Sequence, residues 1–151
     1  MSAGLVEGGG TQAAQPLLHA AVWRDLQDAT DGRGRLTAIE AADHVPFDIA
    51  RVFYVHEVLP GLERAGHAHI DTDQLAIAVH GSLHAELSDG FQTLQFSLDN
   101  PARGLFLPRG VFVRLRSFSP GAVCLVLANT HYDRARSLRS WSDYLAFRGL
   151  R

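Results

Sequence analysis

Short stretches of alternating apolar and polar residues dominate the chain from residue 35 onward, separated by turn residues about every 8 to 12 positions. This spacing is typical of antiparallel sandwiches and barrels. The segment 88–90, Ser-Asp-Gly, supplies one such turn, because Asp and Gly tolerate the positive φ angles of tight hairpins. The pattern predicts an all-β fold with strands over residues 35–40, 49–58, 74–80, 83–87, 94–98, 105–107, 112–118 and 123–128.

The two ends of the chain follow different patterns. After Asp133 the periodicity becomes helical, and Leu138, Trp141, Leu145 and Phe147 predict one apolar stripe on a short C-terminal helix. Residues 1–15 are rich in glycine and show no periodicity, so we expect a flexible N-terminal tail. The predicted organisation is a tail over 1–15 and a single domain over 16–151.

Composition narrows the class of protein. The chain has 151 residues, of which 46% are hydrophobic and 20% charged, enough for one domain with a core. Its net charge of -2 lacks the basic excess that nucleic-acid binding requires. No apolar segment approaches the roughly 20 residues that cross a bilayer, and residues 1–15 do not resemble a signal peptide. We expect a cytoplasmic protein with neither nucleic-acid nor membrane partners.

Two residue types exclude further classes of chemistry. All 14 basic residues are arginine, so mechanisms that use a Schiff-base lysine are excluded. The single cysteine, Cys124, lies in an apolar run and cannot form an internal disulfide or a cysteine-based zinc site.

The most informative segment contains two histidines two positions apart. On an extended segment His67 and His69 project from the same face, roughly 6 to 7 Å apart along the strand. The neighbouring spacing resembles the first motif of the cupin superfamily, G-x5-H-x-H-x3,4-E-x6-G. Gly61, His67, His69 and Gly81 fall on that motif, with Gln74 in the glutamate position.

The cupin motifs normally build a metal site, but this chain lacks two of the four ligands. Gln74 is a weaker ligand than glutamate, and Val113 stands where the second cupin motif has a histidine. A stable transition-metal site usually needs three or more well-placed ligands. We therefore expect no metal and no cofactor. Unligated imidazoles, with an ordinary pKa near 6.5, are free to move protons.

Further motifs cover nearly the whole chain, from about residue 22 to 147. They are the segments 31–40, 46–55 and 64–69, followed by Gln74, Gly81-Ser82 and Tyr132-Asp133. In order and spacing these resemble the dTDP-4-keto-6-deoxy-glucose 3,4-ketoisomerases, whose pattern is D-x-R-G-x-L-x-x-I-E, P-F-x-I-x-R-x-Y-Y, R-G-x-H-A-H-K and a late Y-D. The resemblance implies a cupin barrel, a homodimer that exchanges strands, and a dTDP-linked keto-sugar as substrate in deoxy- or amino-sugar biosynthesis.

The chain departs from the family pattern at three places. Ile70 replaces the lysine after H-A-H, and Phe112 replaces the usual tryptophan of the second motif. Residues 132–139 read Y-D-R-A-R-S-L-R, where the family has Y-D-x-x-D-Y-I-R. These departures leave the sugar, and the configuration of the product at C4, open.

The reaction itself demands particular side chains. Moving a carbonyl from C4 to C3 of a hexose requires a base for the C3 proton and donors that stabilise an enediolate. Histidine suits the first role, and the resemblance favours His69 over His67 as the base. Arginine suits a diphosphate, because its guanidinium forms a bidentate fork. The predicted catalytic residues are His67, His69 and Tyr54, and the predicted substrate-binding residues are Arg33, Arg51, Arg64 and Gln74.

Two other functions fit the same residues. The first is a different cupin enzyme, either a metal-dependent one or a dTDP-sugar epimerase. The second is a cupin that binds a nucleotide sugar without turning it over. Metal content and product structure distinguish the first alternative, and binding without turnover distinguishes the second.

Overall fold

The computed structural model describes residues 15–150, and within them β-strands predominate, as predicted. The strands are β1 (Trp23–Asp25), β2 (Gln27–Asp31), β3 (Gly34–Ala38), β4 (Arg51–Val55), β5 (Arg64–His69), β6 (Gln74–His80), β7 (Leu83–Ser88), β8 (Thr93–Leu98), β9 (Arg103–Leu107), β10 (Phe112–Arg116), β11 (Val123–Ala128) and β12 (Ser137–Leu138). The helical elements are the 3-10 turns η1 (Leu18–Ala20) and η2 (Arg134–Arg136) and the helix α1 (Trp141–Phe147). No helix among residues 15–150 is long and apolar enough to cross a membrane.

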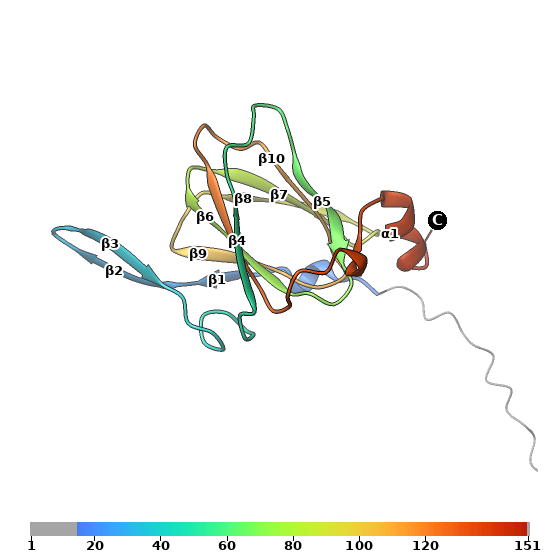
Figure 1. The fold of residues 1–151 in the computed structure, drawn as a ribbon, viewed down its shortest axis with the longest axis horizontal. Helices are drawn as coiled ribbons and strands as arrows, with labels where there is room; N and C mark the ends of the chain where they lie inside the picture. The colour runs from blue at the N-terminus through green and yellow to red at the C-terminus, as the bar shows by residue number, and fades with distance from the viewer. Residues whose placement is uncertain (1–14, 151) are drawn as a thin grey trace, which may run out of the picture.

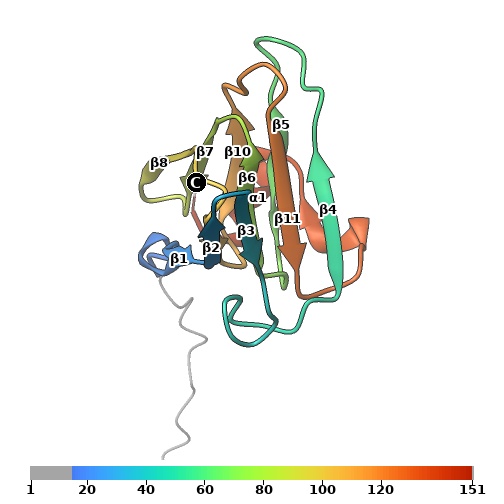
Figure 2. The same ribbon diagram turned by 90° about the vertical axis from the view of Figure 1, so that its left-hand side faces the viewer.

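Two five-stranded antiparallel sheets form the body. Their orders are β1-β9-β6-β11-β4 and β12-β5-β10-β7-β8, so β4 and β8 are edge strands, and they lie at opposite margins of the body (Figure 2). The main core lies between the sheets and draws on both, with Ala76 and Val126 from one sheet and Leu87 and Val113 from the other. In both sheets most neighbouring strands are not consecutive in the sequence, which is typical of a jelly-roll barrel.

Alternation along the strands separates this interior from a second apolar layer. In β6, Ala76 and Ala78 face the interior core, whereas Leu75 and Ile77 pack with Val45 in a cluster on the other side of the sheet. Successive residues of a strand point to opposite faces, and a strand buried on both faces therefore reads as a continuous apolar run. This explains why β6 and β11 are almost entirely apolar.

The β2–β3 hairpin is separate from both sheets. Its two strands pair only with each other, and the hairpin projects from the body on the side away from α1 (Figure 1). Every residue of β2 is exposed, and Leu36 in β3 is 65% exposed. The strand predicted over 35–40 overlaps β3. The sequence pattern did not indicate β1 or β2, because β1 has only three residues and β2 is exposed along its whole length, so neither shows an alternating pattern.

The C-terminal helix is confirmed, but it is shorter than its periodicity implied. It covers only Trp141–Phe147, and the side chain of Ser140 caps it by accepting a hydrogen bond from the backbone N–H of Asp143 at 3.1 Å. The predicted stripe is wrong in two respects. Leu138 belongs to β12 instead, and the residue that the helix buries is Tyr144, whose hydroxyl donates to the carbonyl of Gly110 at 2.6 Å. The predicted tail, 1–15, lies outside the described residues except for its last position.

Candidate active site

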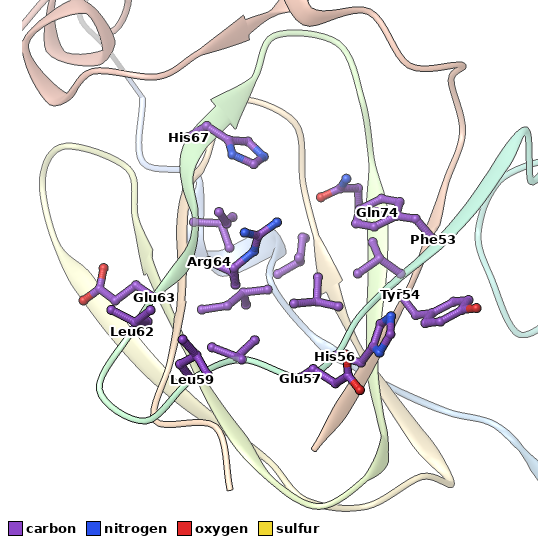
Figure 3. Close-up of a pocket in the computed structure, with 17 residues that line it drawn as sticks. Phe53, Tyr54, His56, Glu57, Leu59, Leu62, Glu63, Arg64, His67 and Gln74 are labelled. Carbon is purple, nitrogen blue, oxygen red and sulfur yellow. The ribbon is translucent and has the colours of Figure 1, made fainter. Parts of the chain in front are cut away.

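A cavity of about 600 Å³ opens inside the barrel (Figure 3). Its apolar wall comes from central strands of both sheets, namely Leu107, Val113, Leu115 and Val126. The polar side chains on its strands come from β5 and β6, and they are Arg64, His67 and Gln74. Apolar walls with a few convergent polar groups are typical of small-molecule sites, which usually have volumes of roughly 300 to 1,000 Å³.

A bulge in β5 brings two functional side chains to the same face. The register with β10 shifts where Val113 pairs with His67 and Arg114 pairs with Ala65, so Gly66 has no partner. Ala65 and Gly66 both have positive φ, at 66° and 79°. The extra residue interrupts the alternation of the strand. Arg64 and His67 are therefore both directed into the cavity, although an odd number of positions separates them (Figure 3).

The two histidines of the H-x-H motif meet as predicted, and more closely than their spacing along the strand. Their Nε2 atoms lie 3.1 Å apart, and the rings are edge to face with centroids 4.7 Å apart. His67 lines the cavity, whereas His69 lies behind it, with its Nε2 also 3.3 Å from the amide nitrogen of Gln74. This geometry favours His67, not His69, as the histidine that a bound molecule would touch.

Burial lowers the pKa of both histidines. It is the main cause for His69, whose pKa falls to about 4, and the charges of His67 and Arg51 act in the same direction. The carboxylate of Asp71 opposes this shift. For His67 burial is again the main cause of the lowered pKa, followed by the charge of Arg139. Both imidazoles are therefore neutral at pH 7, and an anion bound beside them would raise both pKa values.

The cupin ligand positions are brought together, but two of them carry poor ligands. Gln74 lies beside His69, and Val113 lies opposite His67 across the β5–β10 pair. Within residues 15–150 no group of three or more His, Cys, Asp or Glu side chains is arranged to hold a metal ion. The side chains around the histidine pair suit proton transfer better than metal coordination, because a neutral amide and an alkyl group add little to two imidazoles.

Arg51 lies on the same side as the histidines. It begins β4, where alternation places it on the face of Phe53 and Val55, both of which line the cavity. Its guanidinium stacks on the rings of Phe53 and Tyr132 at 5.2 and 5.5 Å, and its buried Nε has no hydrogen-bond partner. A buried guanidinium nitrogen without a partner can bind an anionic or carbonyl oxygen.

Two predicted site residues are not brought to the histidine pair within one chain. Tyr54 alternates to the outer face of β4, is 62% exposed, and directs its ring away from the cavity next to His56 (Figure 3). Arg33 lies at the tip of the β2–β3 hairpin, where it forms an ion pair with Asp31 at 2.9 Å. The inward-facing aromatic residue of β4 is Phe53, at the first tyrosine of the family pattern.

The cavity rim uses residues that no sequence motif indicated. The loop between β4 and β5 contributes Glu57 and Glu63 together with the exposed Leu59 and Leu62. Glu63 forms an ion pair with Arg116 at 3.4 Å. Their position follows from the path of the loop over the barrel, which the local pattern of residues does not reveal.

Residues 19–149 match the sequence family described as FdtA: WxcM-like, C-terminal. The chain belongs to this family. Among curated proteins, it is 34% identical over 114 residues to the TDP-4-oxo-6-deoxy-alpha-D-glucose-3,4-oxoisomerase of Aneurinibacillus thermoaerophilus. That match covers 76% of this chain and 82% of the relative.

Solved structures of similar proteins confirm the cupin-type fold. A 3,4-ketoisomerase from Helicobacter canadensis superposes with a TM-score of 0.83 at 31% identity, covering 85% of this chain and 97% of that one. The sugar 3,4-ketoisomerase QdtA from Thermoanaerobacterium thermosaccharolyticum, solved with TDP, gives a TM-score of 0.85 at 30% identity, covering 88% and 97%. A histidine-to-asparagine variant of QdtA was solved with TDP-4-keto-6-deoxyglucose.

Proposed function

We propose that this chain is a nucleotide-sugar 3,4-ketoisomerase that converts TDP-4-keto-6-deoxyglucose into a TDP-3-keto-6-deoxy-hexose. The observation that carries this proposal is the neutral pair of His67 and His69, with Nε2 atoms 3.1 Å apart, at the wall of a cavity of about 600 Å³. The relatives named as 3,4-ketoisomerases or oxoisomerases support the reaction class.

The reaction needs only proton transfers. An imidazole of the pair removes the C3 proton, the C–H electron pair forms a C3=C4 double bond, and the C4 carbonyl electrons move to its oxygen to give an enediolate. Transfer of the C3 hydroxyl proton to the C4 oxygen, and return of a proton from the imidazolium to carbon C4, then complete the exchange. The C3 hydroxyl is oxidised to a ketone and the C4 ketone is reduced to an alcohol, so no external oxidant, cofactor or metal is required.

His67 is the proposed base. His67 lines the cavity, so it is the imidazole that the sugar can reach. A charge on His67 lowers the pKa of His69, so the first proton that the pair accepts binds to His67. His69 then accepts or donates the hydrogen bond that fixes the tautomer of His67. Gln74 holds His69 in place from the neighbouring sheet. Arg64 and Arg51 are the proposed contacts to the sugar and its diphosphate.

We further propose that the enzyme works as a homodimer. The β2–β3 hairpin exposes Leu36, and the outer face of β4 exposes Val52 and Tyr54, each at more than half of the side chain's full area. Packing the hairpin of one copy on the outer face of another would bury these apolar surfaces. In such a dimer Arg33 contacts the substrate in the partner's cavity, and Tyr54 belongs to the interface. The single buried cysteine favours a cytoplasmic location.

The test is proton NMR of metal-stripped protein with TDP-4-keto-6-deoxyglucose in deuterated water. The proposal expects a 3-keto product that carries solvent deuterium at C4, formed at the same rate with and without a chelator. Deuterium at C5 without a 3-keto product would indicate an epimerase instead. Tight TDP binding with no exchange at any carbon would indicate a binding protein, and activity only after metal is added back would indicate a metal-dependent cupin.

A further inference from the structure

Arg139 is an exposed residue at the end of the strand next to the two histidines, and it was not among the predicted site residues. It follows β12, which pairs antiparallel with β5 so that Ser137 is opposite His69 and Leu138 is opposite Ala68. One further residue along this register brings Arg139 opposite His67. Residues directly opposite one another in an antiparallel pair project to the same face of the sheet.

The packing of β12 shows which face this is. Leu138 and Ala68 pack together with Phe112 and Tyr144, on the side of the sheet that α1 covers. Because alternate residues point to opposite faces, the residue after Leu138 faces away from α1. Arg139 is therefore on the side of the histidines.

The charge of Arg139 acts on both imidazoles. It lowers the pKa of His67, where it is the largest cause after burial, and it also lowers the pKa of His69. Arg51 acts on the same two groups from β4, and Asp71 is the carboxylate that opposes them at His69. The other groups that face the pair, Gln74 and Val113, carry no charge.

Neither cation is neutralised by the protein. Among residues 15–150 no carboxylate lies within ion-pair distance of Arg51 or Arg139, whereas Arg109, Arg116 and Arg136 all have such partners. Two unpaired guanidinium groups beside two neutral imidazoles create a positive potential with nothing bound. Such a site stabilises negative charge that appears next to the base.

We propose that Arg139 is a catalytic residue that stabilises the enediolate formed when the histidine pair removes the C3 proton. This inference rests on the proposed ketoisomerase function. The negative charge develops on the C4 oxygen only after proton removal, so the interaction of Arg139 strengthens in the transition state and acts on kcat. A guanidinium that bound only the diphosphate would stabilise the bound substrate and the transition state equally, so its loss would change KM and not kcat.

The matched comparison uses Arg139→Gln, Arg139→Lys and Arg134→Gln. Arg134 lies on the same C-terminal segment, is also exposed, and its loss removes the same unit of charge, so Arg134→Gln controls for net charge. We expect Arg139→Gln to lower kcat on the order of tenfold or more with KM nearly unchanged, and Arg139→Lys to retain an intermediate kcat. Arg134→Gln should match the wild type.

Two readouts make the outcomes distinct. In Arg139→Gln the acidic limb of the kcat/KM profile should move to higher pH, and an NMR titration should show the same rise in the pKa of His67. A raised KM with unchanged kcat, or no change in either, would overturn the role of Arg139 while leaving the ketoisomerase function intact. A wild-type protein that does not convert the sugar would overturn both.

Discussion

The Nε2 atoms of His67 and His69 face each other at 3.1 Å, so one of these nitrogens carries a proton and the other presents its lone pair. Burial lowers the pKa of both rings and keeps the pair neutral at pH 7. A neutral pair of this kind can accept one proton and then return it. The shift of a carbonyl from C4 to C3 requires such a pair, because a proton is removed from C3 and a proton is then added to C4.

We predict that His67→Asn lowers kcat by about 10³-fold or more, because general-base catalysis by a positioned side chain contributes on the order of 10² to 10⁴. His69→Asn should have a smaller effect, because His69 lies behind His67 and acts by orienting it. The measurement is single-turnover conversion together with C3 proton exchange. If His69→Asn abolishes exchange while His67→Asn preserves it, the assignment of the base is reversed.

Acid should destabilise the protein in two separate pH windows. The folded-state pKa of His69 is about 4 against an ordinary value of 6.5, so between these values the unfolded chain binds more protons and stability falls as pH falls. We expect His69 to account for a loss on the order of 2 kcal/mol across this window, after allowance for solvent screening. The carboxylates with lowered pKa, including Asp71, contribute only below their ordinary 3.8.

Urea unfolding at several pH values measures this effect. The free energy of unfolding of His69→Asn should change less than that of the wild type between pH 6.5 and 4. Ser97→Asn offers a control, because Ser97 is exposed in β8 and the change involves no titratable group. Equal slopes for wild type and His69→Asn would contradict the shifted pKa.

Tyr54→Phe should retain most of the activity. The hydroxyl lies on the outer face of β4, directed away from the cavity, and therefore does not reach the reacting carbons in its own chain (Figure 3). Steady-state kinetics should show a kcat within about threefold of the wild type, in contrast to the 10² or more expected for loss of an acid–base group. A larger drop would restore the catalytic role that the sequence predicted for Tyr54.

The sequence predicted those parts of the fold and site that depend on local spacing. Alternation placed β6 and β11 correctly, and the H-x-H spacing placed His67 and His69 on one face. The local pattern does not decide which of two neighbouring residues points inward. The pair Phe53-Tyr54 illustrates this, because the family pattern has tyrosine at both positions and only the strand's orientation decides which one reaches the cavity.

Other parts of the site depend on contacts between distant segments. Arg139 comes next to the strand of the histidines only because β12 pairs with β5, a contact across about half of the chain. Arg64 faces the cavity only because of the bulge at Ala65 and Gly66, which reverses the alternation that a regular strand would have. Neither the strand pairing nor the bulge leaves a periodic signal in the sequence.

Gly66→Ala should disturb both stability and activity. Gly66 has φ of +79°, and no neighbouring atom lies within 4 Å of an added Cβ, so the cost is backbone strain of about 1 to 2 kcal/mol. Relief of that strain would shift Arg64 and His67 relative to each other and lower kcat. Gly32→Ala is the matched control, since Gly32 also has open space and lacks a positive φ. A Gly66→Ala enzyme as stable and active as Gly32→Ala would contradict this role of the bulge.

The proposed dimer makes Leu36 an interface residue. Its side chain is 65% exposed on the projecting hairpin, and we expect Leu36→Asp to convert a dimer into a monomer in gel filtration with light scattering. Phe91→Asp is the control, because Phe91 is 52% exposed in the turn between β7 and β8, away from the hairpin and from β4. A monomeric wild type, or a Leu36→Asp variant that stays dimeric, would exclude this interface.

If the hairpin of one copy completes the cavity of the other, two inactive variants should complement each other. In a mixed dimer of His67→Asn and Arg33→Ala, one site combines both defects, whereas the other combines an intact histidine pair with an intact hairpin. Random exchange of subunits would therefore restore about a quarter of the sites. Refolding the two variants together and assaying conversion measures this, with each variant refolded alone as the control. If the mixture shows no more activity than the separate variants, Arg33 does not act in the partner's site. In that case no site in a mixed dimer would combine an intact histidine pair with an intact Arg33.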